Sequence, residues 1–371
     1  MVRHESYALK NFIPISAPAT RKPCGETEPS FRVSMGFLPQ WYVERAGVRF
    51  GREWHENCEY RYDMLMKMKQ YLHEIFPAVP EFVPSINAKG FDEDCATLSG
   101  VYGSKVIAML YGFEVQFPEY DWPGDVSNRP MAFEMLSHMK PIDLDDNPHM
   151  EKLELQMDQM ERCFGRIDGF LNYQGVLNTA QKLRGNEIFI DMMEEEAFCD
   201  DLFAHIADTI GKLAFRVQAR QRASGVDIDL LSVSNCVVSM ISPEMYERYI
   251  LPHDLALSKQ FARFGIHTCN WNVTPYMEKL TAIERMGYLD MSASSDLEKA
   301  RRLFPNTRLA IFFTPGDIET LSLDAMEREF HRIASLSSPC DVIFADMTLN
   351  TSDQKLNALI ELADKIEEAY S

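Results

Sequence analysis

The stretch Arg308–Asp346, RLAIFFTPGDIETLSLDAMEREFHRIASLSSPCDVIFAD, decides the fold. Two short apolar runs, Arg308–Phe313 and Asp341–Asp346, predict strands, and the amphipathic stretch Leu323–Ser335 between them predicts a helix. A strand, a helix and a second strand in this order indicate two parallel strands joined by a right-handed crossover. The segment therefore predicts a parallel sheet covered by helices.

The same alternation recurs along the chain. Six further runs are predicted as strands: Arg32–Phe37, Phe82–Asn87, Gly165–Tyr173, Ile228–Asn235, Ile266–Asn270 and Tyr288–Ala293. Helices are predicted over Glu194–Ala223, Pro243–Phe264, Pro275–Met286 and Ser352–Ala369. About eight such units favour an α/β fold of the (β/α)8 barrel type. A doubly wound dinucleotide-binding sheet is disfavoured, because no GxGxxG follows the first strand.

Two segments lie outside this alternation. Residues 1–31 carry several prolines and little apolar periodicity, so an extended N-terminal arm is predicted, followed by a single barrel domain over 32–371. Residues Val106–Phe117, VIAMLYGFEVQF, predict an inserted strand pair joined at Gly112, after the second strand.

Composition excludes several classes of protein. The 371 residues carry a formal charge of −19, which argues against a nucleic-acid partner because such proteins need a basic face. The densest basic group, Arg216, Arg220 and Arg222, is interpreted as the solvated face of a helix. No apolar run is long enough to predict a membrane helix, and the N-terminus does not resemble a signal peptide. Eight cysteines without a CxxC pair indicate reduced thiols and a cytoplasmic location.

A barrel limits where a site is expected, because active sites lie at the carboxyl ends of the strands. His267 and Cys269 are two residues apart at such an end, so both side chains are expected on one side of the strand. A nitrogen and a sulfur ligand aimed at one point form half of a zinc site. For the third ligand, Asp346 at the end of the last strand is favoured over Cys340 at its start, and Cys236 after the fourth strand is the reserve.

Further residues at strand ends or in the first loop are predicted to bind substrate. Aromatic side chains among them suit an uncharged or cationic substrate, although core packing explains them nearly as well. The predicted residues are Met35, Trp41, Asn87, Tyr173, Asn235 and Trp271.

Several segments together resemble the uroporphyrinogen decarboxylase superfamily, and more closely its branch of corrinoid-dependent methyltransferases. They include GIHTCN (Gly265–Asn270), DLEKARRLFPNTRLAIFFTPGDIETL (Asp296–Leu321) and ADMTLNTSDQKLNALIELADK (Ala345–Lys365). The resemblance implies a (β/α)8 barrel. The decarboxylase itself is similar in architecture only, because the loop Met35–Gly47, MGFLPQWYVERAG, has no arginine pair before Trp41.

The methyltransferase branch holds zinc with an HxC at the end of strand five and a cysteine at the end of strand eight. His267 and Cys269 match the first two ligands, whereas Asp346 or no ligand stands at the third. The resemblance thus implies methyl transfer between a corrinoid, carried by a separate corrinoid protein, and a small molecule. Two alternatives remain: a metal-independent lyase or decarboxylase acting on a small acid, and a ligand-binding barrel without catalysis.

Overall fold

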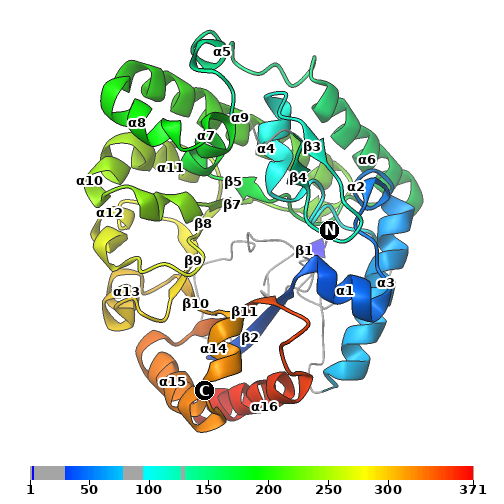
Figure 1. Ribbon diagram of the computed structural model, residues 1–371, viewed down its shortest axis with the longest axis vertical. Coiled ribbons are helices and arrows are strands. Elements are labelled where there is room, and N and C mark those ends of the chain that lie inside the picture. Colours follow the sequence, from blue (N-terminus) through cyan, green and yellow to red (C-terminus); the bar gives the residue numbers. More distant parts are fainter. Residues whose placement is uncertain (1, 4–29, 78–94, 127–129, 371) are drawn as a thin grey trace.

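The computed structural model describes residues 2–3, 30–77, 95–126 and 130–370, which form an α/β fold (Figure 1). Figure 1 shows the strands as an arc around the middle of the molecule, with helices outside them. In the described part of the chain, no helix is both long and apolar enough to cross a bilayer.

Seven parallel strands form the main sheet, in the order β2-β11-β10-β9-β8-β7-β5. Except at β2, each strand lies beside its neighbour in the sequence, as short crossovers require, and the first strand of the sheet pairs with the last. The strands are β2 (Phe31–Phe37), β5 (Tyr173–Gln174), β7 (Leu230–Ser234), β8 (Arg263–His267), β9 (Met286–Ser292), β10 (Arg308–Phe313) and β11 (Cys340–Met347).

The helices cover the outer face of this sheet (Figure 1). The larger ones are α1 (Pro39–Ala46), α3 (Cys58–Ile75), α6 (Pro148–Phe164), α7 (Val176–Arg184), α8 (Glu187–Glu194), α9 (Glu196–Ala223), α11 (Leu251–Ser258), α15 (Leu323–Ser337) and α16 (Asp353–Tyr370). The shorter ones are α2 (Arg52–Glu56), α4 (Val106–Leu110), α5 (Phe133–Ser137), α10 (Pro243–Met245), α12 (Met277–Leu280), α13 (Leu297–Leu303) and α14 (Pro315–Thr320).

Most predicted strands lie within two or three residues of their expected bounds, and Arg308–Phe313 matches at both ends. The predicted strand Gly165–Tyr173 is largely wrong: Tyr173 opens the two-residue β5, and before it Asp168 forms only an isolated parallel bridge with Thr97. The predicted strand Phe82–Asn87 lies outside the described residues.

The predicted insertion needs a correction. Val106–Leu110 is helical, and the antiparallel pair joins β3 (Val115–Gln116) to β4 (Gly124–Asp125), further along the chain. All five residues of α4 are buried, so their apolar run has no period that separates a helix from a strand. Most of the predicted N-terminal arm is not described; Val2–Arg3 forms β1, which pairs with β6 (Val226–Asp227).

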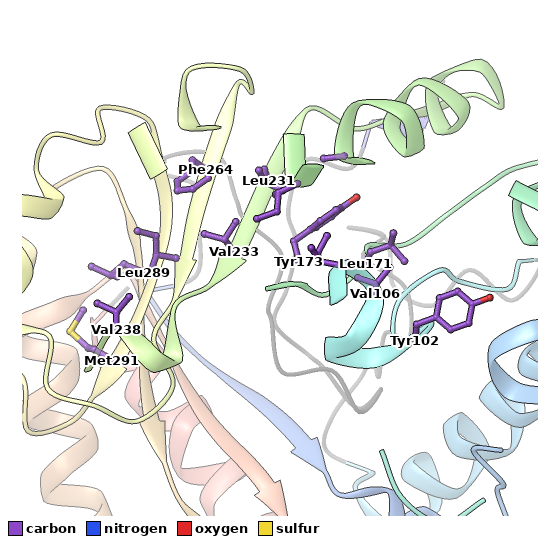
Figure 2. Close-up of a cluster of buried hydrophobic side chains, with 14 of the residues drawn as sticks. Tyr102, Val106, Leu171, Tyr173, Leu231, Val233, Val238, Phe264, Leu289 and Met291 are labelled. Atoms are coloured by element: carbon purple, nitrogen blue, oxygen red, sulfur yellow. The ribbon is translucent and has the colours of Figure 1, made fainter. Parts of the chain in front are cut away.

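The core lies between the sheet and its helices. Figure 2 shows Leu231, Val233 and Tyr173, from neighbouring strands, directed toward one buried cluster. Side chains of β7 and β8 are buried along the whole length of both strands, as expected when helices cover one face and the strands enclose the other.

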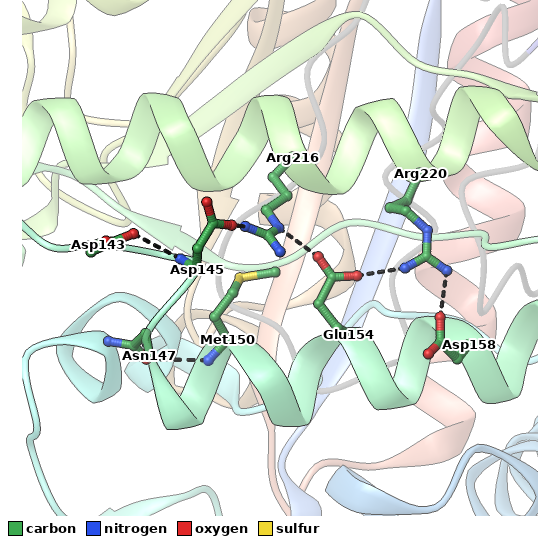
Figure 3. A network of polar contacts seen from close by, with 8 residues as sticks. All are labelled: Asp143, Asp145, Asn147, Met150, Glu154, Asp158, Arg216 and Arg220. Carbon is green, nitrogen blue, oxygen red and sulfur yellow. Dashed lines mark hydrogen bonds and ion pairs between the residues drawn. The ribbon is translucent and has the colours of Figure 1, made fainter.

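Helices α6 and α9 are joined by a network of charges (Figure 3). Glu154 accepts from Arg216 Nε at 2.6 Å and from Arg220 Nη1 at 2.5 Å, and Arg220 also pairs with Asp158 at 2.7 Å. The arginine face is solvated in part, as predicted, and acids of α6 and the segment before it also pair with Arg216 and Arg220.

Candidate metal centre

Two adjacent strands bring the sulfur and nitrogen ligands together. Ser234, the last residue of β7, pairs in register with His267, the last residue of β8. The backbone N–H of Asn235 then donates to the carbonyl of His267 at 2.7 Å. Cys236, the next residue, therefore lies beside the turn that carries Cys269.

The three side chains form one compact group. Cys269 Sγ lies 3.0 Å from His267 Nε2 and 2.9 Å from Cys236 Sγ. All three ligand atoms lie within 4.8 Å of one another. This set, of two sulfurs and one imidazole nitrogen, is one that zinc favours. The ligand atoms lie closer together than around a bound tetrahedral zinc ion, so binding would move the side chains slightly apart.

The backbone reaches this geometry by a turn after β8. The strand ends at His267, and Cys269 has a φ of 62°, in the left-handed region. Thr268 fixes the turn, because its N–H and its hydroxyl donate to Asp290 at 2.5 and 2.6 Å. The predicted convergence of His267 and Cys269 is confirmed, although a turn produces it in place of strand alternation.

Behind the histidine lies a buried carboxylate that the sequence analysis missed. Asp290 Oδ2 lies 2.5 Å from His267 Nδ1 and accepts from the hydroxyl of Tyr288 at 3.0 Å. A proton held on Nδ1 leaves the lone pair of Nε2 facing the two thiols, which is the tautomer that a metal requires. The sequence did offer one sign of this carboxylate, because Asp290 is the single acid in the apolar run Tyr288-Leu289-Asp290-Met291.

The three side chains also shift one another's pKa values. The hydrogen bond with Cys269 and the charge of His267 lower the pKa of Cys236 to about 5, and the same hydrogen bond raises the pKa of Cys269. Burial opposes the charge of His267, but the carboxylate of Asp290 raises the pKa of His267 well above its ordinary value. A thiolate beside an imidazolium is thus favoured, so that metal binding would release protons.

The sequence analysis favoured Asp346 as the third ligand, but the group that the structure forms contains Cys236, the reserve. Asp346 is an exposed residue near the end of β11, with a φ of 54°. Partial desolvation raises the pKa of its carboxyl, and the nearby charge of His267 opposes that rise. Asp346 therefore lies close to the group without joining it. Its role as a ligand stays a prediction.

Asn235 connects the group to a buried acid. Its Nδ2 donates to Asp254 Oδ2 at 2.9 Å, and the hydroxyl of Tyr246 donates to the same oxygen at 2.9 Å. Burial raises the pKa of Asp254 to about 7. Gly175 completes the packing, because a Cβ there would lie 2.0 Å from Asn235 Oδ1.

Of the predicted substrate residues, some line a cavity and others are buried. Asn235 and Trp271 line one small cavity together with Tyr246, Thr268 and Tyr276. Met35, Trp41 and Tyr173 are at most 4% exposed. Asn87 lies outside the described residues.

Trp41 packs between an aromatic side chain and a guanidinium group. Its ring centroid lies 4.2 Å from that of Phe37, and the Arg45 guanidinium lies 4.5 Å from the ring on a face of it. These contacts account for Trp41 without a ligand, which favours the core-packing explanation that the sequence left open.

Comparisons with known proteins agree with the fold. No family model matches the chain, and no curated protein matches it by sequence. Among solved structures, a methyltransferase from Methanosarcina mazei is similar with a TM-score of 0.63 at 13% identity, over 94% of this chain and 96% of that protein. At this identity the similarity shows a shared fold over nearly the whole of both chains.

Proposed function

We propose that the protein is a methyltransferase that uses a zinc ion held by Cys236, His267 and Cys269 to move a methyl group between a corrinoid and a small molecule. The group of two thiols and one imidazole carries this proposal. The shared fold with a methyltransferase supports it.

The residues fit zinc in three respects. Their donor atoms are sulfur and nitrogen, they are close enough to share one ion, and Asp290 orients the imidazole from behind. Three protein ligands leave a fourth position for a substrate atom. Zinc, when bound, stabilises the thiolate form of a coordinated substrate thiol near neutral pH.

The reaction that we propose is a direct displacement. The substrate sulfur forms a bond to the methyl carbon, the carbon–cobalt bond breaks, and its electron pair stays with the corrinoid. The protein's own residues would hold the sulfur in line with the methyl group, and such orientation contributes to the rate gain. A separate corrinoid protein is the proposed methyl carrier, as the resemblance to the corrinoid-dependent methyltransferases implies.

We further propose that the sheet closes into a (β/α)8 barrel. The pairing of β2 with β11 supports closure, because a barrel brings the first strand in the sequence beside the last one. The carboxyl ends of β7, β8 and β11 then share one mouth, as in barrel enzymes. We also propose a cytoplasmic location, since the seven cysteines in the described part of the chain are free thiols, Cys236 and Cys269 included.

Metal content tests the proposal. The parent protein, purified without chelator, is compared with Cys236→Ala, Asp346→Ala and a control, Cys163→Ala, at an exposed cysteine of α6. We expect close to one zinc per chain in the parent, in the control and in Asp346→Ala, and a large loss in Cys236→Ala. Equal zinc in Cys236→Ala and the parent, with loss in Asp346→Ala, would instead support the aspartate as ligand.

Activity is measured in a second step. Free methylcobalamin replaces the carrier protein, and a panel of small thiols is supplied as acceptors. We expect methyl transfer with the zinc-loaded parent and none with Cys236→Ala. A zinc-loaded parent that transfers no methyl group to any thiol would refute the thiol acceptor.

A further inference from the structure

Cys236 joins the proposed metal centre from a different strand than His267 and Cys269 do. It follows β7 and opens η2 (Cys236–Met240), a short 3-10 helix. The N–H groups in the first turn of a helix have no acceptor inside that helix, so another group has to accept from them. The groups that hold this turn therefore determine where the sulfur of Cys236 lies.

Asn178 of α7 accepts from one of these N–H groups. Its Oδ1 lies 2.9 Å from the backbone nitrogen of Val237, the residue directly after Cys236. Its Nδ2 donates to Gln174 Oε1 at 2.9 Å, so both polar atoms of the amide have partners. Asn178 is 6% exposed, and a hydrogen bond shielded from water is electrostatically stronger than one in water. The helix α7, which packs against η2, thus fixes the first turn of η2.

The same chain of amides continues to the strand before Cys236. Gln174 Nε2 donates to Asn172 Oδ1 at 2.9 Å, and Ser234 Oγ donates to that oxygen at 3.4 Å. Ser234 is the last residue of β7 and is fully buried. Four hydrogen bonds in series therefore connect Ser234 to Val237, across the segment that carries Cys236.

A second contact acts on Asn235, which directly precedes Cys236. Asn235 Nδ2 donates to the buried Asp254 at 2.9 Å, and its N–H donates to the carbonyl of His267 at 2.7 Å. With Val237 bound to Asn178, both neighbours of Cys236 in the chain are held by buried side chains. Rotation about the Cα–Cβ bond of Cys236 is then the main freedom that its sulfur keeps.

We propose that Asn178 is a positioning residue of the metal centre, which holds Val237 and thereby places the sulfur of Cys236 beside His267 and Cys269. The inference rests on the proposed function, because a positioning role requires that Cys236 is a ligand. Asn178 would do for Cys236 what a hydrogen-bonding partner does for a ligating histidine, whose loss usually weakens metal binding by about 10- to 100-fold.

Cobalt(II) is the probe for this role, because it binds sites that bind zinc and its absorption reports thiolate ligands and coordination geometry. The full-length parent is titrated with cobalt(II) without oxygen, beside Asn178→Ala, Asn178→Asp and Cys236→Ala. The control is Asn147→Ala, whose asparagine accepts from the N–H groups of His149 and Met150 at the start of α6.

We expect Asn178→Ala to bind cobalt(II) about 10- to 100-fold more weakly than the parent, with thiolate absorption altered toward that of Cys236→Ala. Asn178→Asp keeps an oxygen for the N–H of Val237 and should resemble the parent. Asn147→Ala loses a helix cap, so it should lower the urea midpoint without changing the spectrum or the affinity. This control separates a misplaced ligand from a general loss of stability.

Unchanged affinity and spectrum in Asn178→Ala would overturn the inference, and so would an equal change in Asn147→Ala. If Asn178→Ala does not fold, Asn178→Leu answers the same question, because leucine has a similar shape and makes neither hydrogen bond. A parent that binds no cobalt(II), or binds it without thiolate absorption, would refute the metal centre itself and the positioning role with it. Normal binding by the parent with no effect in the Asn178 variants would refute the positioning role alone.

Discussion

At the scale of single residues, Asp290 determines how well His267 can bind a metal. Its carboxylate is fully buried and holds Nδ1, so that Nε2 faces the thiols. We expect Asp290→Asn to weaken zinc binding by about 10- to 100-fold, which is usual when the partner of a ligating histidine is lost. Competition with a chromophoric chelator measures the affinity.

The control for this change is Asp208→Asn, at an exposed aspartate of α9 that pairs with Lys212. It removes the same charge from the protein without touching the centre. Equal zinc affinity in Asp290→Asn and the parent would show that the carboxylate only supports the fold.

Asp254 gives a second prediction at this scale, on stability. Burial raises its pKa from an ordinary value of 3.8 to about 7. Between these values the folded chain keeps a proton that the unfolded chain has lost, so the contribution of this group to stability falls as the pH rises from about 4 to 7. The full effect is up to about 4 kcal/mol.

Asp254→Asn should therefore remove this decline, because an amide oxygen still accepts from Asn235 and Tyr246 and carries no charge. We expect the variant to match the parent near pH 4.5 and to exceed its free energy of unfolding above pH 7, as measured by urea denaturation across that range. A constant difference between the two proteins over the whole range would contradict the prediction.

The residues of the site differ in how far the sequence predicts them. His267 and Cys269 lie in one short motif, so their spacing in the sequence is enough to predict that their side chains meet. Cys236 and Asp290 join the group only through the pairing of β8 with β7 and β9, and no spacing along the chain encodes that register. The sequence analysis favoured Asp346 because it ends the last predicted strand, level with His267 and Cys269, and no local signal placed Cys236 ahead of it.

At the scale of elements, the long helix α9 is held to α6 by charges as well as by packing. Glu154 is the shared acceptor, and its side chain is only 20% exposed. We expect Glu154→Gln to lower the free energy of unfolding by about 1 kcal/mol, the upper end for partly exposed ion pairs. Urea denaturation with Glu151→Gln, at an exposed residue of the same helix, as the control measures the difference.

Salt separates this charge effect from packing. The difference between Glu154→Gln and the parent should shrink in 1 M salt, where exposed charges are screened. A loss of stability that does not change with salt would assign the effect to the shape of the side chain.

Helices and strands were predicted where their periodicity is strong, as in α15 and β10. They were mistaken where burial removes periodicity, as in α4, and where a strand is only two residues long, as in β5. A strand of two residues is too short to show an alternation of apolar and polar residues, so only its pairing with the neighbouring strand identifies it.

At the scale of the whole molecule, buried charges join the first strand of the main sheet to the two strands beside it. Asp341 of β11 accepts from Arg32 of β2 at 2.5 Å and from Arg308 of β10 at 2.5 Å. Asp341 and Arg308 are fully buried. The same pairing joins the first strand of the main sheet to its last strand in the sequence, so we expect β2 to unfold together with the rest of the sheet.

Asp341→Asn would remove the carboxylate that faces the buried charge of Arg308, and breaking a buried ion pair costs about 3–5 kcal/mol. We expect that loss in the free energy of unfolding, with one cooperative transition in both circular dichroism and tryptophan fluorescence. The matched control is Asp353→Asn, whose aspartate pairs with Arg45 at a site that is 30% exposed, and it should cost about 1 kcal/mol or less. If Asp341→Asn instead unfolded in two steps, β2 would be an appended strand, and the first-to-last pairing would no longer support a closed barrel.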